Sequence, residues 1–236
     1  MDVSIIIPAF NEQAKISTDI ISAEHFLLEN KFTGQIIIVD DGSTDKTFQV
    51  AEQTKVKKPI MLLVIKVPQH VGKGNAIRTG VNCSQGRYVL FADSGNCIPY
   101  KYALSAIRMI QEGQCDMGYA SRKLPQSTIL KPQSLRRQIT SWIFRNIVLF
   151  RLVPSELTDT QCGFKVYKGD IARKLYAQSV CDGFLLDVEI IKRAVKNKYR
   201  IREFPVEWSC DPDSRLSLFK NLPKLIRELG RLMTMR

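Results

Sequence analysis

The sequence predicts an α/β protein built on an open, doubly wound and mostly parallel sheet flanked by helices. Two observations support this prediction. Short apolar runs rich in β-branched residues alternate with amphipathic stretches through the first 120 residues, and a repeated strand, helix, strand order is typical of this fold class. The apolar runs are also continuous rather than alternating, as in strands that are buried on both faces of a parallel sheet.

The expected strands cover residues 3–8 (VSIIIP), 35–40 (QIIIVD), 60–67 (IMLLVIKV) and 87–92 (RYVLFA). The stretches around them predict helices over residues 12–30, 45–55, 73–84 and 99–112. The second of these helices opens with STDKT, whose Ser, Thr and Asp are typical of a helix start. With 236 residues and 44% hydrophobic content, the chain is long enough for one large domain, or for one domain with an appendage.

The charge of the chain predicts an anionic partner. Lys and Arg total 35 against 23 Asp and Glu, which gives a formal net charge of +12. Phosphorylated ligands, an anionic membrane surface and nucleic acid all suit this balance. The chain carries no helix-turn-helix, RNP or OB sequence pattern, so we do not expect a nucleic-acid partner.

Cysteine and histidine usage argues against a zinc site and against a disulfide framework. The six cysteines form no CxxC pair, and no histidine cluster accompanies them. A reducing cytosolic compartment is the simplest account. The N-terminus lacks the basic region and apolar core of a signal peptide, and no stretch reaches about 18 uncharged apolar residues, so we expect a cytoplasmic protein without membrane spans.

Polar residues follow three of the expected strands at the point where each strand ends. Ligands of doubly wound sheets bind at the carboxyl ends of the strands, so these residues are candidates for a binding site at one rim. Turn formation by Asn, Asp, Gly and Ser is the alternative for any one loop, although two carboxylates and a glycine after IIIV make it a weaker explanation for the set. The candidates are Pro8, Ala9, Asn11, Glu12, Asp40, Asp41, Asp93 and Ser94.

Two basic segments follow the alternating part of the chain. Residues 134–154 combine arginines with apolar residues at helical spacing, which predicts an amphipathic helix in a membrane interface; a helix packed on the protein's own core is the alternative. The last 22 residues contain a single acid, Glu228, and predict a second basic amphipathic helix. Each basic residue near an anionic surface contributes on the order of 1 kcal/mol, so the two segments together predict attachment to an anionic membrane.

Four motifs in order resemble the family 2 glycosyltransferases, which have a GT-A fold. They are IIIPAFNE, IIIVDDGSTDKT, GKGNAIRTG and RYVLFAD, and they cover the first 100 residues. DTQCGFKVY (159–167) and FPVEWSCDPDSRLSL (204–218) are similar to one branch of this family. That branch moves a sugar from a nucleotide to a polyprenyl phosphate and includes the dolichyl-phosphate glucosyl- and mannosyltransferases.

The resemblance implies a GT-A catalytic domain over residues 1–212, with a nucleotide-binding half (1–115) and an acceptor-binding half (116–212), and a C-terminal amphipathic helix at 213–236. It implies inverting transfer of a hexose from a UDP-glucose or GDP-mannose type donor to a dolichyl or undecaprenyl phosphate at the cytosolic membrane face. A separate membrane-anchoring subunit is a further expected partner. A family 2 enzyme with a non-prenyl acceptor, and a nucleotide-sugar-binding subunit without turnover, are the alternatives.

The donor site needs acceptors for the base and ribose, and cations for the diphosphate. By resemblance, Asp41 or the neighbouring Asp40 accepts from the base, and Glu12 accepts from ribose or base groups. Lys73 and Arg78, in GKGNAIRTG, meet phosphate or the rim of the base pocket. Ser214 and Arg215 match an element of the family that closes over the donor phosphates. GKG is neither a Walker A sequence nor GxGxxG, which argues against a P-loop kinase and a dinucleotide dehydrogenase.

The family usually holds Mg²⁺ or Mn²⁺ with an Asp-x-Asp motif after the fourth strand. This chain has Asp93-Ser94-Gly95 there, so the second carboxylate is missing. Mg²⁺ often takes only one or two protein carboxylates, so Asp93 with Asn96 is the expected metal site, with weak affinity in the absence of donor. Replacement of the metal by a cation such as Lys73, and loss of activity, are the alternatives.

The acceptor phosphate needs arginine forks, and a phosphate nucleophile is already ionised at neutral pH, so it needs no general base. The expected acceptor residues are Arg122, Arg136 and Arg137. By resemblance, the residues that face the sugar or acceptor are Asp159, Gln161 and either Asp187 or Glu189. The alternative for Asp187 and Glu189 is capping, or pairing with Arg202 and Lys192.

Overall fold

In this computed structural model, the described residues are 1–133, 152–210 and 222–234. Four predicted site residues lie outside these ranges, namely Arg136, Arg137, Ser214 and Arg215. Most of the basic segment 134–154, and residues 213–221 of the predicted C-terminal helix, lie outside them as well.

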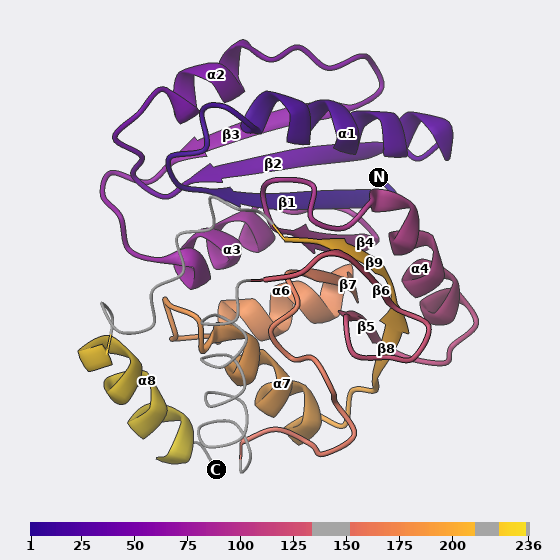
Figure 1. The fold of residues 1–236 in the computed structure, drawn as a ribbon, viewed down its shortest axis with the longest axis vertical. Coiled ribbons are helices and arrows are strands. Elements are labelled where there is room, and N and C mark those ends of the chain that lie inside the picture. Colours follow the sequence, from indigo (N-terminus) through magenta and orange to yellow (C-terminus); the bar gives the residue numbers. More distant parts are fainter. Residues whose placement is uncertain (134–151, 211–221, 235–236) are drawn as a thin grey trace.

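A seven-stranded sheet runs through the molecule (Figure 1). Its strands are β1 (Val3–Ala9), β2 (Gly34–Asp40), β3 (Met61–Lys66), β4 (Tyr88–Ala92), β5 (Met117–Ser121), β7 (Phe164–Lys168) and β8 (Ile201–Pro205). Their order is β3-β2-β1-β4-β7-β5-β8, and only β7 among these seven is antiparallel to its neighbours. The prediction of an open, mostly parallel α/β sheet is confirmed, and the four expected strands lie at β1 to β4.

Helices cover both faces of this sheet. They are α1 (Ile16–Glu29), α2 (Thr47–Gln53), α3 (Lys73–Asn82), α4 (Ala103–Gln111), α6 (Gly169–Ala177) and α7 (Leu186–Lys196), with a 3₁₀ turn, η1 (Tyr100–Tyr102), before α4. The predicted helices are present, but α1 begins at Ile16 rather than at residue 12, because residues 10–12 form a loop at the sheet edge.

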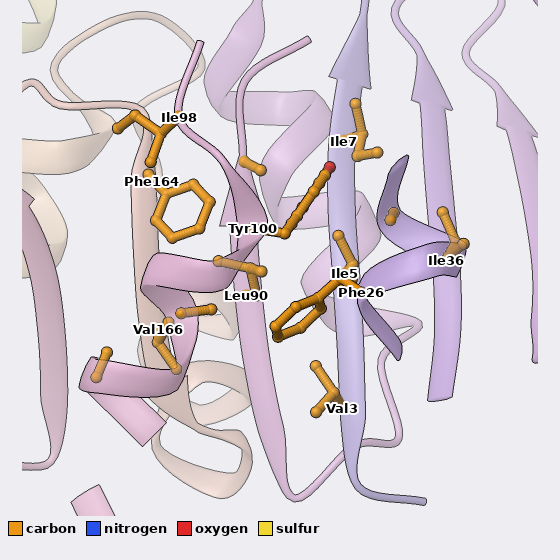
Figure 2. Close-up of a cluster of buried hydrophobic side chains, with 14 of the residues drawn as sticks. Val3, Ile5, Ile7, Phe26, Ile36, Leu90, Ile98, Tyr100, Phe164 and Val166 are labelled. Atoms are coloured by element: carbon orange, nitrogen blue, oxygen red, sulfur yellow. The ribbon is translucent and has the colours of Figure 1, made fainter. Parts of the chain in front are cut away.

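The two faces of the sheet carry two hydrophobic clusters, because successive side chains of a strand point to opposite sides. In β1, Ile5 and Ile7 pack into the first cluster and Ile6 into the second. The first cluster includes apolar residues of α1, α2 and α4, and Figure 2 shows Phe26 and Leu90 within it. The second includes residues of α3, α6 and α7. Burial on both faces explains the continuous apolar runs in the sequence.

The second half of the chain completes the same sheet. A separate small sheet pairs β6 (Thr128–Lys131) in parallel with β9 (Glu207–Ser209). The C-terminal helix α8 (Leu222–Thr234) lies beyond α7 and buries Leu232 in the second cluster (Figure 1). Strands from residues 1–115 and from 116–212 join one sheet, and the functional division between these halves stays a prediction.

Candidate active site

The ends of three neighbouring parallel strands form one edge of the sheet. β2, β1 and β4 are adjacent in the sheet and parallel, so Asp40, Ala9 and Ala92 end them on the same side (Figure 1). The backbone N–H of Asp41 donates to the carbonyl oxygen of Ala9 at 2.9 Å, which ties two of the loops together. The loops after β1 and β2 therefore meet at this edge, and the loop after β4 follows the strand on the other side of β1.

The loop after β1 is joined to the loop after β2 by hydrogen bonds. Asn11 adopts a positive φ of 58°, and its Oδ1 accepts the backbone N–H of Thr44 at 2.8 Å. Its own N–H donates to the Ser43 hydroxyl at 2.8 Å, and the N–H of Glu12 donates to the Thr47 hydroxyl at 2.7 Å. The NE and STDKT motifs thus hold each other, so Asn11 has a structural role in addition to any contact with a ligand.

Asp40 and Asp41 are adjacent but have different environments. The Asp40 side chain is fully buried, its Oδ1 accepts the Ser43 N–H at 3.0 Å, and its Oδ2 has no hydrogen-bond partner among the described residues. Asp41 accepts the N–H groups of Val71 at 3.1 Å and Gly72 at 2.8 Å. A buried carboxylate oxygen without a partner is costly, so Asp40 keeps an unused acceptor at the strand end, which a ligand reaches once the atoms that cover it move.

The segment that Asp41 holds leads directly to the start of α3. His70 Nδ1 lies 2.8 Å from Asp41 Oδ2, and the His70 ring stacks on Phe10 with ring centroids 4.0 Å apart. Gly42, with φ 71°, packs so closely on this segment that an added Cβ would lie 2.5 Å from the backbone nitrogen of His70. These contacts fix the approach of Lys73, the first residue of α3, to the sheet edge.

Lys73 and Asp93 form an ion pair at the end of β4. Lys73 Nζ lies 2.6 Å from Asp93 Oδ1, and the two side chains are 25% and 35% exposed, so a ligand can reach both. Burial works to lower the pKa of Lys73, but the charges of Asp93 and Asp187 outweigh it and raise this pKa above its usual value. Lys73 is therefore a charged, accessible cation at the predicted donor site.

Gly163 makes room for the Asp93 carboxylate. The Asp93 N–H donates to the Gly163 carbonyl at 2.8 Å, and a Cβ at residue 163 would lie 1.8 Å from Asp93 Oδ2. No side chain fits in this space. The glycine of the DTQCGF motif is thus explained by close contact with the strand-end aspartate.

The residues after Asp93 are hydrogen-bonded to α1. Their partner is Asp19, a buried acid that sequence reasoning missed. Asp19 accepts the Ser94 hydroxyl at 2.7 Å and the Gly95 N–H at 3.0 Å, and burial raises the pKa of Asp19. Asn96 Nδ2 donates to the Ser22 hydroxyl at 3.0 Å. The signal for Asp19 was an acid on the apolar stripe of α1, between Ile16 and Ala23.

These contacts decide whether the residues fit a divalent metal. Within the described ranges, no three His, Cys, Asp or Glu side chains are grouped so that they could hold a metal ion. Asp93 is one carboxylate, and its Oδ1 is already neutralised by Lys73, while Ser94 and Asn96 are bonded to α1. The described residues do not fit Mg²⁺ or Mn²⁺ without displacement of Lys73, and a metal at Asp93 and Asn96 stays a prediction of the resemblance.

Arg122 and Asp159 form a fork-to-fork pair on the acceptor side. Arg122 Nε and Nη2 donate to the two Asp159 oxygens at 2.6 and 2.8 Å, and the guanidinium lies 5.1 Å from the Trp208 ring centroid. Burial works to raise the pKa of Asp159, but the Arg122 hydrogen bonds and charge outweigh it and lower this pKa. Glu203, a residue that sequence reasoning missed, accepts the Asp159 N–H at 2.7 Å. Asp159 therefore positions Arg122, which is 22% exposed at its side chain.

Asp187 is paired with a buried lysine of the central sheet. Lys165 Nζ lies 2.8 Å from Asp187 Oδ1 and donates to the Cys162 carbonyl at 2.7 Å. Lys165 is fully buried, and its position between apolar residues of β7 gave no sequence signal for this role. Gln161 Nε2 is buried without a partner among the described residues. Burial also raises the pKa of the Cys162 thiol to about 12.

Glu189 and Arg78 have structural partners. The Glu189 carboxylate accepts the Val180 N–H at 3.0 Å and pairs at 2.7 Å with Arg193, rather than with Arg202 or Lys192 as the alternative had it. Arg78 is ion-paired with Asp182, whose carbonyl accepts the Gly74 N–H at the start of α3. A donor contact by Arg78 stays a prediction.

The sequence profile of glycosyl transferase family 2 matches residues 4–176. The chain belongs to this family. The family 2 enzyme is 30% identical to the dolichyl-phosphate beta-glucosyltransferase of Dictyostelium discoideum, over 97% of this chain and 73% of that protein. It is also 30% identical to the dolichyl-phosphate beta-glucosyltransferase of Saccharomyces cerevisiae, over 96% of this chain and 72% of that protein. These matches make the chain a hexosyltransferase.

The solved structures to which this family 2 enzyme is similar include glucosyl-3-phosphoglycerate synthase from Mycobacterium tuberculosis, in complex with Mn²⁺ and UDP-glucose. The TM-score is 0.69 at 17% identity, covering 99% of this chain and 78% of that chain. This likeness shows a shared GT-A fold. In the part of the chain that the structure describes, no helix is long and apolar enough to cross a membrane.

Proposed function

We propose that this hexosyltransferase moves a hexose from a nucleotide sugar to a polyprenyl phosphate, with inversion, at the cytosolic face of a membrane. The observation that carries the proposal is the meeting of Asp40, Lys73 and Asp93 at one sheet edge. A buried carboxylate oxygen without a partner suits a base or ribose donor, and an accessible ammonium suits a diphosphate. The names of the relatives in Dictyostelium and Saccharomyces support a polyprenyl phosphate as the acceptor.

The donor would lie across the tips of β2, β1 and β4. Pro8, Ala9 and Glu12 border this edge, and Asp40 Oδ2 would accept from the base or ribose. Asp41 would act by holding the segment that leads to Lys73. Contacts from Ser214 and Arg215 belong to residues outside the described ranges and stay predictions.

In the reaction, an oxygen of the acceptor phosphate attacks the anomeric carbon. A new C–O bond forms as the bond from that carbon to the β-phosphate oxygen breaks, and its electron pair leaves with the nucleoside diphosphate. Because the nucleophile is already an anion, the protein must mainly align the attack and stabilise the leaving diphosphate. Attack from the opposite side gives a β-linked product from an α-linked donor.

The acceptor phosphate would be held by Arg122, which Asp159 and Trp208 orient. Arg136 and Arg137 are further candidates from the sequence. Gln161, with its buried amide nitrogen, and Asp187, paired with Lys165, would face the sugar. An anionic membrane surface, and a membrane-anchoring subunit, would bring the lipid to this side.

A donor screen tests the proposed function. The full chain is incubated with a short-chain polyprenyl phosphate and, separately, with labelled UDP-glucose, UDP-galactose and GDP-mannose. We expect one donor to yield a β-linked polyprenyl-phosphate hexose. Transfer only to a non-prenyl acceptor contradicts the acceptor assignment, and nucleotide binding without any transfer contradicts the enzymatic assignment.

The Asp40→Asn variant tests the observation that carries the proposal. It keeps the size of the side chain but can place an N–H donor where a ligand donor is expected, so nucleotide affinity should fall about tenfold or more. Isothermal titration with UDP and GDP measures the change. Asp170→Asn, at an exposed position on α6, is the matched control and should leave the affinity unchanged.

A further inference from the structure

The backbone conformation of the loop after β4 disfavours a second metal ligand at residue 95. Gly95, which stands where the family has an aspartate, adopts φ 92°, a region that strains any residue with a Cβ. Its N–H is bonded to the buried Asp19, which keeps the loop directed toward α1. Residue 95 therefore supplies no carboxylate, and its backbone conformation favours glycine.

A cation that belongs to the protein already lies beside the remaining carboxylate. Lys73 Nζ is 2.6 Å from Asp93 Oδ1 and 5.2 Å from the centroid of the Phe91 ring. Lys165 Nζ lies 5.5 Å from the same centroid. Two ammonium groups therefore lie close to the Phe91 ring, each paired with one carboxylate, Asp93 or Asp187.

The geometry of Lys73 leaves part of its ammonium available. An ammonium has three N–H donors, and Asp93 is the one hydrogen-bond partner of Lys73 Nζ described within residues 1–133, 152–210 and 222–234. The side chain is one quarter exposed, whereas Lys165 is fully buried. Lys73 can therefore bind Asp93 and a phosphate oxygen together, whereas Lys165 already donates to Asp187 and to the Cys162 carbonyl.

We propose that Lys73 binds the donor diphosphate in place of a divalent metal ion, and that Asp93 positions Lys73 for this contact. The inference rests on the proposed function in taking a nucleotide sugar as the donor. As the C–O bond to the β-phosphate breaks, negative charge grows on the leaving oxygens next to the fixed ammonium. The N–H groups of Lys73 then bridge the Asp93 carboxylate and the donor diphosphate. Nucleotide binding therefore needs no added metal.

Isothermal titration of the full chain with UDP and with GDP tests this proposal without any transfer reaction. Each nucleotide is titrated in EDTA and in Mn²⁺. We expect the nucleotide that binds to show affinities in the two buffers that agree within about threefold. Lys73→Met should weaken binding about tenfold or more in EDTA, the loss expected for a charge-assisted hydrogen bond, and Lys73→Arg should restore part of it.

Lys174→Met is the matched control. Lys174 Nζ also lies over an aromatic ring, 5.7 Å from the centroid of Tyr199, but Lys174 is on α6, and Tyr199 precedes the start of β8, away from the strand ends that carry the predicted donor site. This variant should bind nucleotide as the unmodified protein does. Thermal unfolding of each variant separates a lost contact from a lost fold, and Lys73→Arg provides a second measurement if Lys73→Met is unstable.

Three results overturn the proposal: nucleotide binding that appears only with Mn²⁺, unchanged affinity in Lys73→Met, and no binding of either nucleotide in either buffer. The proposed function fails in a different way. Metal-independent binding that depends on Lys73, with no transfer from any donor in the screen, would support the role of Lys73 and contradict the hexosyl transfer to polyprenyl phosphate.

Discussion

Single residues at the sheet edge are fixed by contacts that leave little freedom for substitution. Asp93 is held between the Lys73 ammonium and the backbone at Gly163. Arg122 is held by both oxygens of Asp159. In each case a charged group that a ligand can reach is oriented by a partner. The position of each charged group therefore depends on its partner, Gly163 and Lys73 for Asp93 and Asp159 for Arg122.

Gly163→Ala tests the contact at Asp93. The added methyl group would meet the Asp93 carboxylate, so we expect Lys73 to shift, with lower nucleotide affinity and a lower melting temperature. Gly230→Ala is the control, because nothing lies within 4 Å of a Cβ at this position in α8. There the change should stabilise the protein by roughly 0.5–1 kcal/mol. Equal effects of the two substitutions on nucleotide binding contradict the interpretation.

The Asp159 and Arg122 pair predicts a pH dependence of stability. The pKa of Asp159 is lower in the folded protein than the usual 3.8. The ionised carboxylate therefore contributes stability above that value, and the contribution is lost as the pH falls through the lowered folded pKa. Asp159→Asn should lower the free energy of unfolding by about 3 kcal/mol near neutral pH, with a difference that shrinks below about pH 4.

Urea denaturation across this pH range measures the difference between Asp159→Asn and the unmodified chain. Asp170→Asn, on the exposed face of α6, serves as the control and should show a small difference at every pH. A loss of stability in Asp159→Asn that stays constant down to the lowest pH at which the protein is folded contradicts the assignment.

At the scale of elements, helix α8 is fastened to the start of α3 through one short segment. Glu228, the single acid of the basic C-terminus, is buried and accepts the N–H groups of Asp182 at 3.0 Å and Gly183 at 2.9 Å. The Asp182 carbonyl in turn accepts the Gly74 N–H at 2.8 Å. Gly74 lies next to Lys73. The C-terminal helix is therefore connected through hydrogen bonds to the predicted donor site.

Glu228→Ala should loosen this connection. Removal of the carboxylate leaves two backbone N–H groups without their acceptor, which costs roughly 1–3 kcal/mol. Hydrogen exchange should become faster at Asp182, Gly183 and the residues of α8, and Glu228→Gln, which keeps one acceptor oxygen, should have a smaller effect. Glu52→Ala, at an exposed position of α2, is the matched control. Unchanged exchange at residues 182 and 183 in Glu228→Ala would contradict this role.

At the scale of the whole molecule, the excess of positive charge and the outer face of α8 suit an anionic surface. The net charge is +12. Ile226 and Met233 on α8 are 61% and 75% exposed, and Arg227 and Arg231 are exposed beside them. Apolar and basic groups on one exposed helix combine the two interactions that hold a helix at a lipid interface.

Vesicle flotation tests this surface. We expect binding to vesicles with anionic lipid at low salt and release as the salt rises from about 0.1 to 1 M, because the Debye length falls from about 10 to 3 Å. A variant with Arg227→Glu and Arg231→Glu should bind less than one with Lys55→Glu and Lys57→Glu, which changes the net charge equally near α2. Equal binding of the two variants, or binding that ignores salt, contradicts a role for α8.

Much of the fold was predictable from the sequence because the evidence is local. The runs at β1, β2, β3 and β4 are apolar on both faces, and this pattern by itself indicates a covered parallel sheet. The antiparallel direction of β7 was not predictable, because a strand shows the same side-chain pattern in either direction. The boundaries at the sheet edge also depended on long-range contacts, such as that between Asn11 and Thr44.

The sequence by itself determined the class of the fold, the family, and the residues that gather at the strand ends, since these follow from apolar patterning and short motifs. The tertiary structure decided how those residues are used. It showed that Lys73 pairs with Asp93, that Asp19 holds the loop at Gly95, and that Lys165 pairs with Asp187. Each of these pairs joins residues from different elements. Only the packing of those elements fixes their distances, and these in turn set which charges are free to meet a ligand.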